Sequence, residues 1–159
     1  MSKHAYLFPG QGSQFSGMGK NLYETNNAAK ELFERANKIV GFRISDIMFE
    51  GTDEQLKQTN VTQPAVFIHS VVAYLTAENP QPAMVAGHSL GEFSALCASG
   101  AINYVDAVEL VHQRGKLMGE ACQSINAGMM AILGLEDDVV ETLCEQAQTE
   151  GKKVWPANY

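Results

Sequence analysis

Short apolar runs and longer stretches of helical periodicity alternate along the chain. Two runs of four residues, 5–8 and 83–86, are bounded by proline or glycine and predict buried strands. Apolar residues at helical spacing predict helices over 27–40, 89–99 and 104–122. A further helix is predicted to start at Thr62, with Pro64 in its first turn. Strands that alternate with helices predict an α/β fold with a mainly parallel sheet flanked by helices.

Capping signals mark several of the expected helix ends. Ser45 and Thr52 are expected to cap two short helical turns, and Gly41 is expected to end the helix over 27–40. Asn103 and Asp106 are spaced as in a capping box, which predicts that the long helix starts at residue 104.

The pattern changes after residues 126–128, Asn-Ala-Gly. Residues 129–133 predict a strand, 136–150 an acidic helix and 154–157 another strand. This β-α-β order predicts that residues 126–159 begin a second, smaller subdomain, and that residues 1–125 form a separate unit.

Composition narrows the function classes. The chain has 159 residues, 45% hydrophobic and 18% charged, enough to bury the core of one substantial domain. A net charge of −7 argues against nucleic acid as a partner, and no stretch resembles a signal peptide or a membrane span. Cys97, Cys122 and Cys144 are widely spaced without a metal or disulfide pattern, which favours buried thiols in a cytoplasmic protein.

The segment around Ser89 carries the clearest chemical signal. Ser89 has Gly87 two positions before it and Gly91 two positions after it, between an expected strand and an expected helix. This is the nucleophile-elbow pattern, in which a tight turn exposes a serine hydroxyl at a helix N-terminus that favours negative charge. The glycine-rich stretch 10–19 lacks the lysine and spacing of a phosphate-binding loop, and we expect it to bring a backbone amide close to the elbow.

Arg114 is the second residue with unusual surroundings. An arginine on an apolar helix face needs an anion or a carboxylate partner, so the sequence leaves open a bound substrate anion, an internal ion pair or a side chain that reaches the surface. His112 points about 200° away around the helix, and His69 is expected to be a core histidine. The apolar residues at helical neighbour positions are Leu110, Val111, Leu117 and Met118.

Three blocks stand together in a characteristic order: Pro9-Gly10-Gln11-Gly12-Ser13-Gln14, Gly87-His88-Ser89-Leu90-Gly91-Glu92 and Gln113-Arg114-Gly115-Lys116-Leu117-Met118. In this order and spacing, the chain resembles the malonyl-CoA:acyl-carrier-protein transacylases of fatty-acid synthesis and the acyltransferase domains of polyketide synthases. The resemblance runs through the whole chain. It implies an α/β-hydrolase-like large subdomain, with residues 1–125 as its N-terminal part, and a small ferredoxin-like subdomain that starts within residues 126–159.

The resemblance also implies a reaction and its catalytic residues. Ser89 would take the malonyl group from malonyl-CoA as an ester and pass it to the phosphopantetheine thiol of acyl carrier protein. The backbone amides of Gln11 and Leu90 would form the oxyanion hole. Arg114 would bind the free malonyl carboxylate through paired donors.

The remaining implied site residues are Gln63, His88 and Met118, which would line the substrate site. His88 would support the elbow rather than act as a base. The resemblance implies no bound cofactor, no metal and no nucleic-acid or membrane partner, because coenzyme A arrives as the substrate thioester and phosphopantetheine is carried by the acceptor protein.

One family feature is missing from the sequence. The family's general base is a histidine well after the arginine helix, and this chain has no histidine after His112. We therefore expect the N-terminal part of a longer enzyme, inactive alone and with exposed apolar surface. Two alternatives stay open: a serine esterase or thioesterase with the same elbow, and a catalytically silent module that docks acyl carrier protein through Lys116, Lys152 and Lys153.

Overall fold

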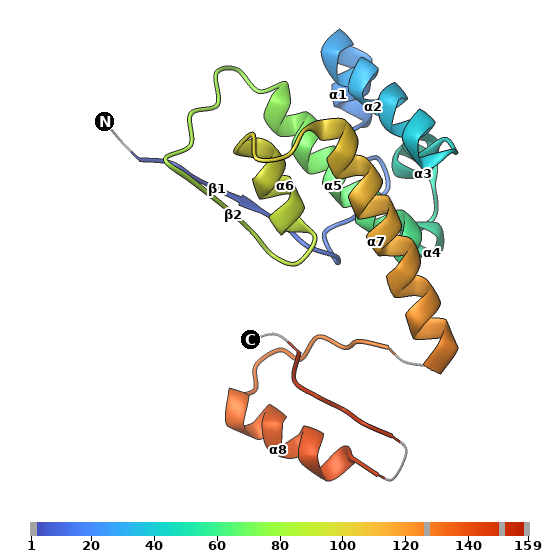
Figure 1. Ribbon diagram of the computed structural model, residues 1–159, viewed down its shortest axis with the longest axis vertical. Coiled ribbons are helices and arrows are strands. Elements are labelled where there is room, and N and C mark those ends of the chain that lie inside the picture. Colours follow the sequence, from blue (N-terminus) through green and yellow to red (C-terminus); the bar gives the residue numbers. More distant parts are fainter. Residues whose placement is uncertain (1–2, 126–127, 150–151, 158–159) are drawn as a thin grey trace. The chain divides into compact units, whose positions relative to one another are not determined.

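The computed structural model describes residues 3–125, 128–149 and 152–157. These residues divide into two compact units, one spanning residues 1–126 and the other residues 127–159 (Figure 1). The first unit contains the sheet and seven of the helices that the structure describes. It therefore contains Ser89, Arg114 and the other residues that the resemblance places in the acyl-transfer site.

The sheet of the first unit consists of two parallel strands within the described part of the chain. β1 (Ala5–Phe8) pairs with β2 (Met84–Gly87), with Ala5 opposite Met84 and Phe8 opposite Gly87. Both strands were predicted, and their parallel pairing confirms the expected α/β class. Because the two strands run in the same direction, their carboxyl ends lie together, and the stretch after β1 meets the elbow after β2.

The helices of the first unit lie between β1 and β2 in the sequence and after β2. The bounds are α1 (Lys20–Thr25), α2 (Asn27–Val40), α3 (Ile44–Glu50), α4 (Asp53–Leu56), α5 (Thr59–Leu75), α6 (Gly91–Ala98) and α7 (Tyr104–Ile125). Helix α5 is the central one, and it packs against α2, α6 and α7. Figure 1 shows α7 running alongside α5 over much of its length.

The core explains why α5 is apolar on nearly every side. All the residues from Val61 to Ile68 are buried, as are Val71 and Val72, so this helix has almost no solvent-facing side. Large side chains from the surrounding helices complete the core, with Phe33, Ile44, Met48, Phe67 and Val108 all almost inaccessible to solvent. Burial of this kind stabilises the fold by roughly 1.5–3 kcal/mol for each large apolar side chain.

Side-chain caps fix three of the helix starts. The Asn26 Oδ1 atom accepts a hydrogen bond from the Ala29 amide at 3.1 Å, and the Asn103 Oδ1 atom accepts one from the Asp106 amide at 3.0 Å. Thr52 and Gln55 form a reciprocal capping box at α4. The predicted starts at Thr52 and Asn103 are therefore confirmed, and so is Gly41 at the end of α2, where its φ is +81°.

Two predicted helix starts are wrong. Ser45 lies inside α3, which begins at Ile44, because its hydroxyl and amide bond the buried Asn37 side chain at 2.9 and 3.0 Å instead of capping the helix. Helix α5 begins at Thr59 rather than Thr62, so Pro64 lies inside the helix. The Thr62 hydroxyl donates to the carbonyls of Leu56 and Gln58, which holds the first turn together despite the missing proline N–H.

The second unit has one helix in its described residues, α8 (Asp137–Ala147), within the range predicted for the acidic helix. The strands predicted over 129–133 and 154–157 are wrong, because the described residues of this unit form only an isolated antiparallel bridge between Thr149 and Lys152. An apolar run becomes a strand only when a neighbouring strand pairs with its backbone. The assignment of residues 1–125 and 126–159 to large and small ferredoxin-like subdomains stays a prediction.

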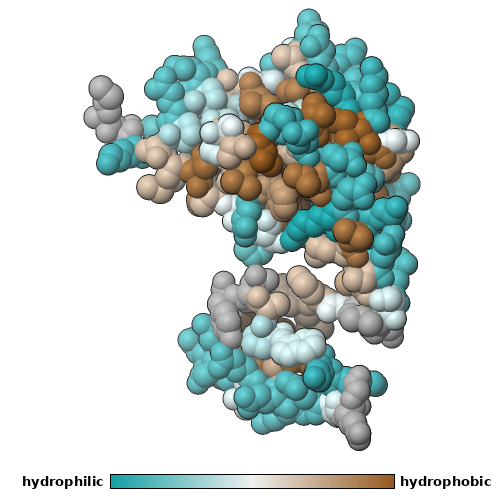
Figure 2. All heavy atoms as spheres, in the orientation of Figure 1, coloured by the Kyte–Doolittle hydropathy of each residue, from teal (hydrophilic) through white to brown (hydrophobic). Residues whose placement is uncertain are grey.

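Several large apolar side chains reach the surface of the first unit. Figure 2 shows hydrophobic residues on the face that carries α6 and α7, and Leu96, Leu110 and Leu117 on these helices are each at least 44% exposed. This agrees with the exposed apolar surface expected from the sequence. In the part of the chain that the structure describes, no helix is both long and apolar enough to cross a membrane.

Candidate active site

The turn between β2 and α6 places the half-buried Ser89 at a tight corner. Ser89 has a φ of +55°, in the left-handed region that residues with a Cβ atom rarely adopt. A Cβ atom on Gly87 would overlap the backbone carbonyl of Gly91, and one on Gly91 would overlap the carbonyl of Phe8. The two glycines are therefore required by close backbone contacts, and the strained serine is the nucleophile elbow expected from the sequence.

Backbone hydrogen bonds hold this corner against the end of β1. The His88 amide donates to the Phe8 carbonyl at 3.1 Å, and the Gly91 amide donates to the His88 carbonyl at 2.9 Å. The Glu92 amide donates to the Ser89 carbonyl at 3.1 Å, which starts the first turn of α6. Ser89 is thus fixed by the strand before it and the helix after it.

Arg114 reaches the serine from α7. Its Nη2 atom lies 3.0 Å from Ser89 Oγ and donates a hydrogen bond to it, while its Nη1 atom donates to Gln63 Oε1. The guanidinium carbon lies 6.0 Å from the centre of the Phe93 ring, within the range of a cation–π contact. The structure describes no carboxylate in an ion pair with Arg114, so its charge is directed toward the serine hydroxyl.

Gln63 connects Arg114 to two further residues. It lies on α5 and is 1% exposed. Its Nε2 atom is 3.4 Å from Gln11 Oε1 and 3.5 Å from Met118 Sδ. The structure therefore brings Ser89, Arg114, Gln63, Gln11 and Met118 into one hydrogen-bonded group, although they come from four different parts of the sequence.

Gln11 and Leu90 are the residues whose backbone amides the resemblance assigns to an oxyanion hole. Leu90 is fully buried and precedes the first residue of α6, and Gln11 follows β1. Neither amide donates a hydrogen bond to any of the residues that the structure describes. A Cβ atom on Gly10 would come within 2.8 Å of the His88 carbonyl, so the stretch after β1 approaches the elbow closely, as expected.

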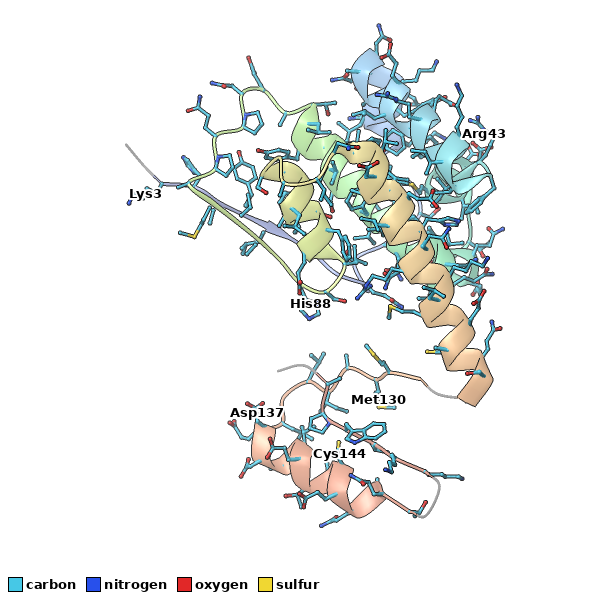
Figure 3. All side chains as sticks on the ribbon, viewed as in Figure 1. Lys3, Arg43, His88, Met130, Asp137 and Cys144 are labelled. Atoms are coloured by element: carbon cyan, nitrogen blue, oxygen red, sulfur yellow. The ribbon has the colours of Figure 1, made fainter. Side chains whose placement is uncertain are left out.

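Three histidines, His69, His88 and His112, form no hydrogen bond with Ser89 Oγ in the part of the chain that the structure describes. Figure 3 shows the exposed His88 ring projecting outward from the turn between β2 and α6. His69 packs its ring against Phe15, with 5.9 Å between the ring centres, and burial lowers the pKa of His69. His112 lies 6.2 Å from the Phe42 ring, on a different side of α7 from Arg114, and its Nδ1 atom has no partner among the described residues.

Comparison with known proteins explains this combination of elbow and arginine. Residues 5–157 match the model of a family described as the acyl transferase domain. The chain belongs to this family. The match covers nearly every residue of the chain, so both the elbow and Arg114 lie within the acyl transferase domain.

Three relatives show what this acyl transferase domain is similar to. The malonyl CoA-acyl carrier protein transacylase of Bacillus subtilis is 44% identical over 99% of this chain and 50% of its own length. The crystal structure of malonyl-CoA:acyl carrier protein transacylase from Helicobacter pylori is 44% identical, with a TM-score of 0.81 over 91% of this chain and 48% of that chain. A type II polyketide synthase malonyl-transacylase in complex with its acyl-carrier protein is 34% identical, with a TM-score of 0.78.

The match covers part of the length of each of these relatives. The chain spans about half the length of the curated relatives and of the solved structures that it matches. Solved structures at this level of similarity confirm the α/β fold of the first unit.

Sequence reasoning missed one part of the group around Ser89. It placed Gln63 in the pocket without a partner, and it left open which group Arg114 meets. The structure shows that Arg114 contacts Gln63 and Ser89. The apolar neighbours of Arg114 and the glycine directly after it were the available signals, because together they indicate an arginine beside a closely packed helix.

Proposed function

We propose that this acyl transferase domain transfers a malonyl group from malonyl-CoA to the phosphopantetheine thiol of acyl carrier protein. The observation that supports this most directly is the 3.0 Å hydrogen bond from Arg114 to Ser89 Oγ. A cation within one hydrogen bond of a nucleophile favours an acyl group whose own negative charge lies a few atoms from the reacting carbonyl. A malonyl thioester has that chemistry, whereas an acetyl thioester does not.

In the first half of the proposed reaction, Ser89 Oγ attacks the thioester carbonyl of malonyl-CoA. The new C–O bond replaces the C–S bond, coenzyme A leaves as its thiolate, and the serine proton passes to a base. The amides of Gln11 and Leu90 would stabilise the oxyanion of the tetrahedral intermediate. Arg114 would bind the free carboxylate through its fork of donors, as guanidinium groups do with planar anions.

In the second half, the thiol of phosphopantetheine attacks the malonyl ester on Ser89. The carrier thioester forms, the C–O bond breaks and the proton returns to the serine. No resident cofactor takes part, because coenzyme A and phosphopantetheine are both carried by the reactants. We place the reaction in the cytoplasm, where free cysteines such as the buried Cys97 stay reduced.

The proposed reaction needs a base that the described residues do not place at the serine. Arg114 is the side chain that bonds Ser89 Oγ among them, and an arginine stays protonated. General-base assistance contributes roughly 10²- to 10⁴-fold to such steps. We therefore expect the 159-residue chain to acylate very slowly in malonyl-CoA alone and faster when imidazole in solution supplies a base.

Intact-mass spectrometry tests the proposal. The chain is incubated with malonyl-CoA, with and without imidazole, beside the Ser89→Ala variant. The expected result is the mass of one malonyl group on the wild-type chain, gained faster with imidazole, and no such gain on Ser89→Ala. Equal modification of both proteins, or none on the wild-type chain with imidazole, would contradict the proposal. Equal modification by acetyl-CoA would favour a general serine esterase instead.

A further inference from the structure

Gln63 is a buried polar side chain whose hydrogen-bonding atoms all lie within the site. Its Oε1 atom accepts from Arg114 Nη1, and its Nε2 atom faces Gln11 Oε1 at 3.4 Å and Met118 Sδ at 3.5 Å. The residue is 1% exposed. A buried amide is costly unless it is bonded, so a hydrophobic residue at this position would give a simpler core. The amide therefore needs an explanation beyond packing.

The orientation of the Gln63 amide is fixed by its partners. An arginine side chain has only donors, so the atom that faces Arg114 must be the carbonyl oxygen of the amide. The NH₂ group then points toward Gln11 Oε1 and the weakly accepting thioether of Met118. Turning the amide over would place donors against donors on the Arg114 side. Gln63 therefore presents a single, defined acceptor to the guanidinium group.

Close packing of α5 and α7 makes this contact possible. A Cβ atom on Gly115 would lie 3.2 Å from Gln63 Cβ and 2.9 Å from the Thr59 carbonyl oxygen. The absence of a side chain at Gly115 lets α7 approach α5 at the level of Gln63. Arg114, the residue directly before that glycine, can then bond Gln63 with one nitrogen and Ser89 with another.

A neutral acceptor suits an arginine that must bind an anion. A carboxylate at position 63 would form an ion pair with Arg114, and a substrate carboxylate would then compete with it. An amide oxygen holds the guanidinium group in place without neutralising its charge. Residue type, burial and contacts thus all favour a positioning role for Gln63.

We propose that Gln63 is a positioning residue that orients Arg114 for the carboxylate of the acyl thioester. This inference rests on the proposed function, because it assumes that Arg114 binds that carboxylate. Gln63 then acts on ligands that carry a free carboxylate and not on those that lack one. Its contribution is to selectivity rather than to binding of the coenzyme A portion.

Isothermal titration calorimetry with malonyl-CoA and acetyl-CoA tests the role of Gln63. Gln63→Met removes the amide while keeping similar volume, and Gln63→Glu keeps the shape while adding a charge. We expect the Kd for malonyl-CoA to rise about tenfold in Gln63→Met, as for loss of one hydrogen bond to a charged group, and further in Gln63→Glu. The Kd for acetyl-CoA should change less than about twofold in both variants.

Two controls make the measurement specific. Gln113→Met makes the same replacement on α7, where the exposed Gln113 side chain bonds only Glu109 among the described residues, and should change neither Kd. In an Arg114→Ala background, Gln63→Met should cause no further loss of malonyl-CoA affinity, because the residue it positions is gone. Circular dichroism checks that each variant is folded, and Gln63→Glu, which matches the wild-type shape, provides the test if Gln63→Met is not.

The outcomes distinguish a failure of the positioning role of Gln63 from a failure of the proposed malonyl transfer. Equal losses for malonyl-CoA and acetyl-CoA in the position-63 variants would show a purely structural role and overturn the inference, and so would unchanged affinity for malonyl-CoA. If the wild-type chain binds the two thioesters equally or binds neither, carboxylate recognition itself fails, and both proposals are overturned.

Discussion

Replacing Ser89 by glycine is expected to give a more stable protein than replacing it by alanine. Ser89 has a φ of +55°, and alanine would keep the strain of that conformation while glycine would not. Both variants lose the hydroxyl that accepts from Arg114, so that hydrogen bond cancels when the two are compared. The comparison therefore isolates the backbone strain at the elbow.

The size of the effect follows from two opposing contributions. A left-handed conformation costs a residue with a Cβ atom roughly 1–2 kcal/mol. The greater freedom of glycine in the unfolded chain offsets roughly 0.5–1 kcal/mol of this. Ser89→Gly should therefore exceed Ser89→Ala in its free energy of unfolding by about 0.5–1 kcal/mol.

Ser99 is the matched control at the other end of α6. Its φ is −79°, in the ordinary helical region, and its hydroxyl bonds the Leu96 carbonyl at 2.9 Å. No strain is relieved there, so Ser99→Gly should be less stable than Ser99→Ala by about 0.5–1 kcal/mol. The same pair of substitutions should thus have opposite signs at the two ends of one helix.

Urea unfolding followed by far-ultraviolet circular dichroism measures these differences. The helical signal reports mainly on the first unit, whereas Trp155, the one tryptophan of the chain, lies in the second unit and would not report on the elbow by fluorescence. If Ser89→Gly is no more stable than Ser89→Ala, or if the difference has the same sign at Ser99, the elbow is not strained and the reasoning fails.

Three further predictions concern other parts of the first unit. Gly91→Ala should lower the free energy of unfolding by about 3 kcal/mol or more because the added Cβ would meet the backbone of β1. Gly119→Ala, in open space on α7, should raise the free energy of unfolding by about 0.5–1 kcal/mol. Equal effects of the two variants in urea titrations would refute the close contact between Gly91 and β1. Hydrogen bonds from Tyr23 and Arg43 hold the pKa of Glu34 below its ordinary value. The Glu34 carboxylate therefore contributes stability above the ordinary pKa, and this contribution is lost as the pH falls through the lowered pKa. Glu34→Gln should flatten the acid side of the curve of unfolding free energy against pH, and an unchanged slope would contradict this. Of the three thiols expected to be buried, Cys97 is buried, whereas the expectation is wrong for Cys122, which is exposed, and for Cys144, which is half-buried. Burial raises the pKa of the Cys97 thiol, so iodoacetamide should modify Cys122 before Cys97, and equal rates in mass mapping of the two cysteines would contradict this.

The parts of the fold that the sequence predicts well have strong local signals. The predicted bounds of β1 and α2 agree with the structure, because a proline ends the strand and a capping asparagine and a glycine bound the helix. Helix α1 was missed because it has six residues and none of them is buried, so it lacks a periodic apolar face. The strands predicted after residue 128 were wrong because strand formation depends on pairing with another segment, which local pattern does not contain.

The group around Ser89 divides in the same way. The elbow is a local feature, since Gly87, Ser89 and Gly91 determine the turn and can be recognised in the sequence by their spacing. The contact between Gln63 and Arg114 joins residues 51 positions apart and depends on how closely α5 and α7 pack. The oxyanion and substrate roles assigned to Gln11, Leu90, His88 and Met118 stay predictions, because geometry alone does not show what a residue binds.

This division bears on how Ser89 and Arg114 are held beside each other. Ser89 lies on a strained turn, whereas Arg114 is carried by α7, a 22-residue helix, and bonds Gln63 from the buried helix α5. Close packing of α5 against α7 favours a fixed distance between the Ser89 hydroxyl and the guanidinium group. Because the turn and both helices lie within the first unit, the elements of this unit determine the 3.0 Å spacing between Ser89 Oγ and Arg114 Nη2. Under the function proposed above, that spacing would suit an acyl group whose carboxylate lies a few atoms from its thioester carbonyl.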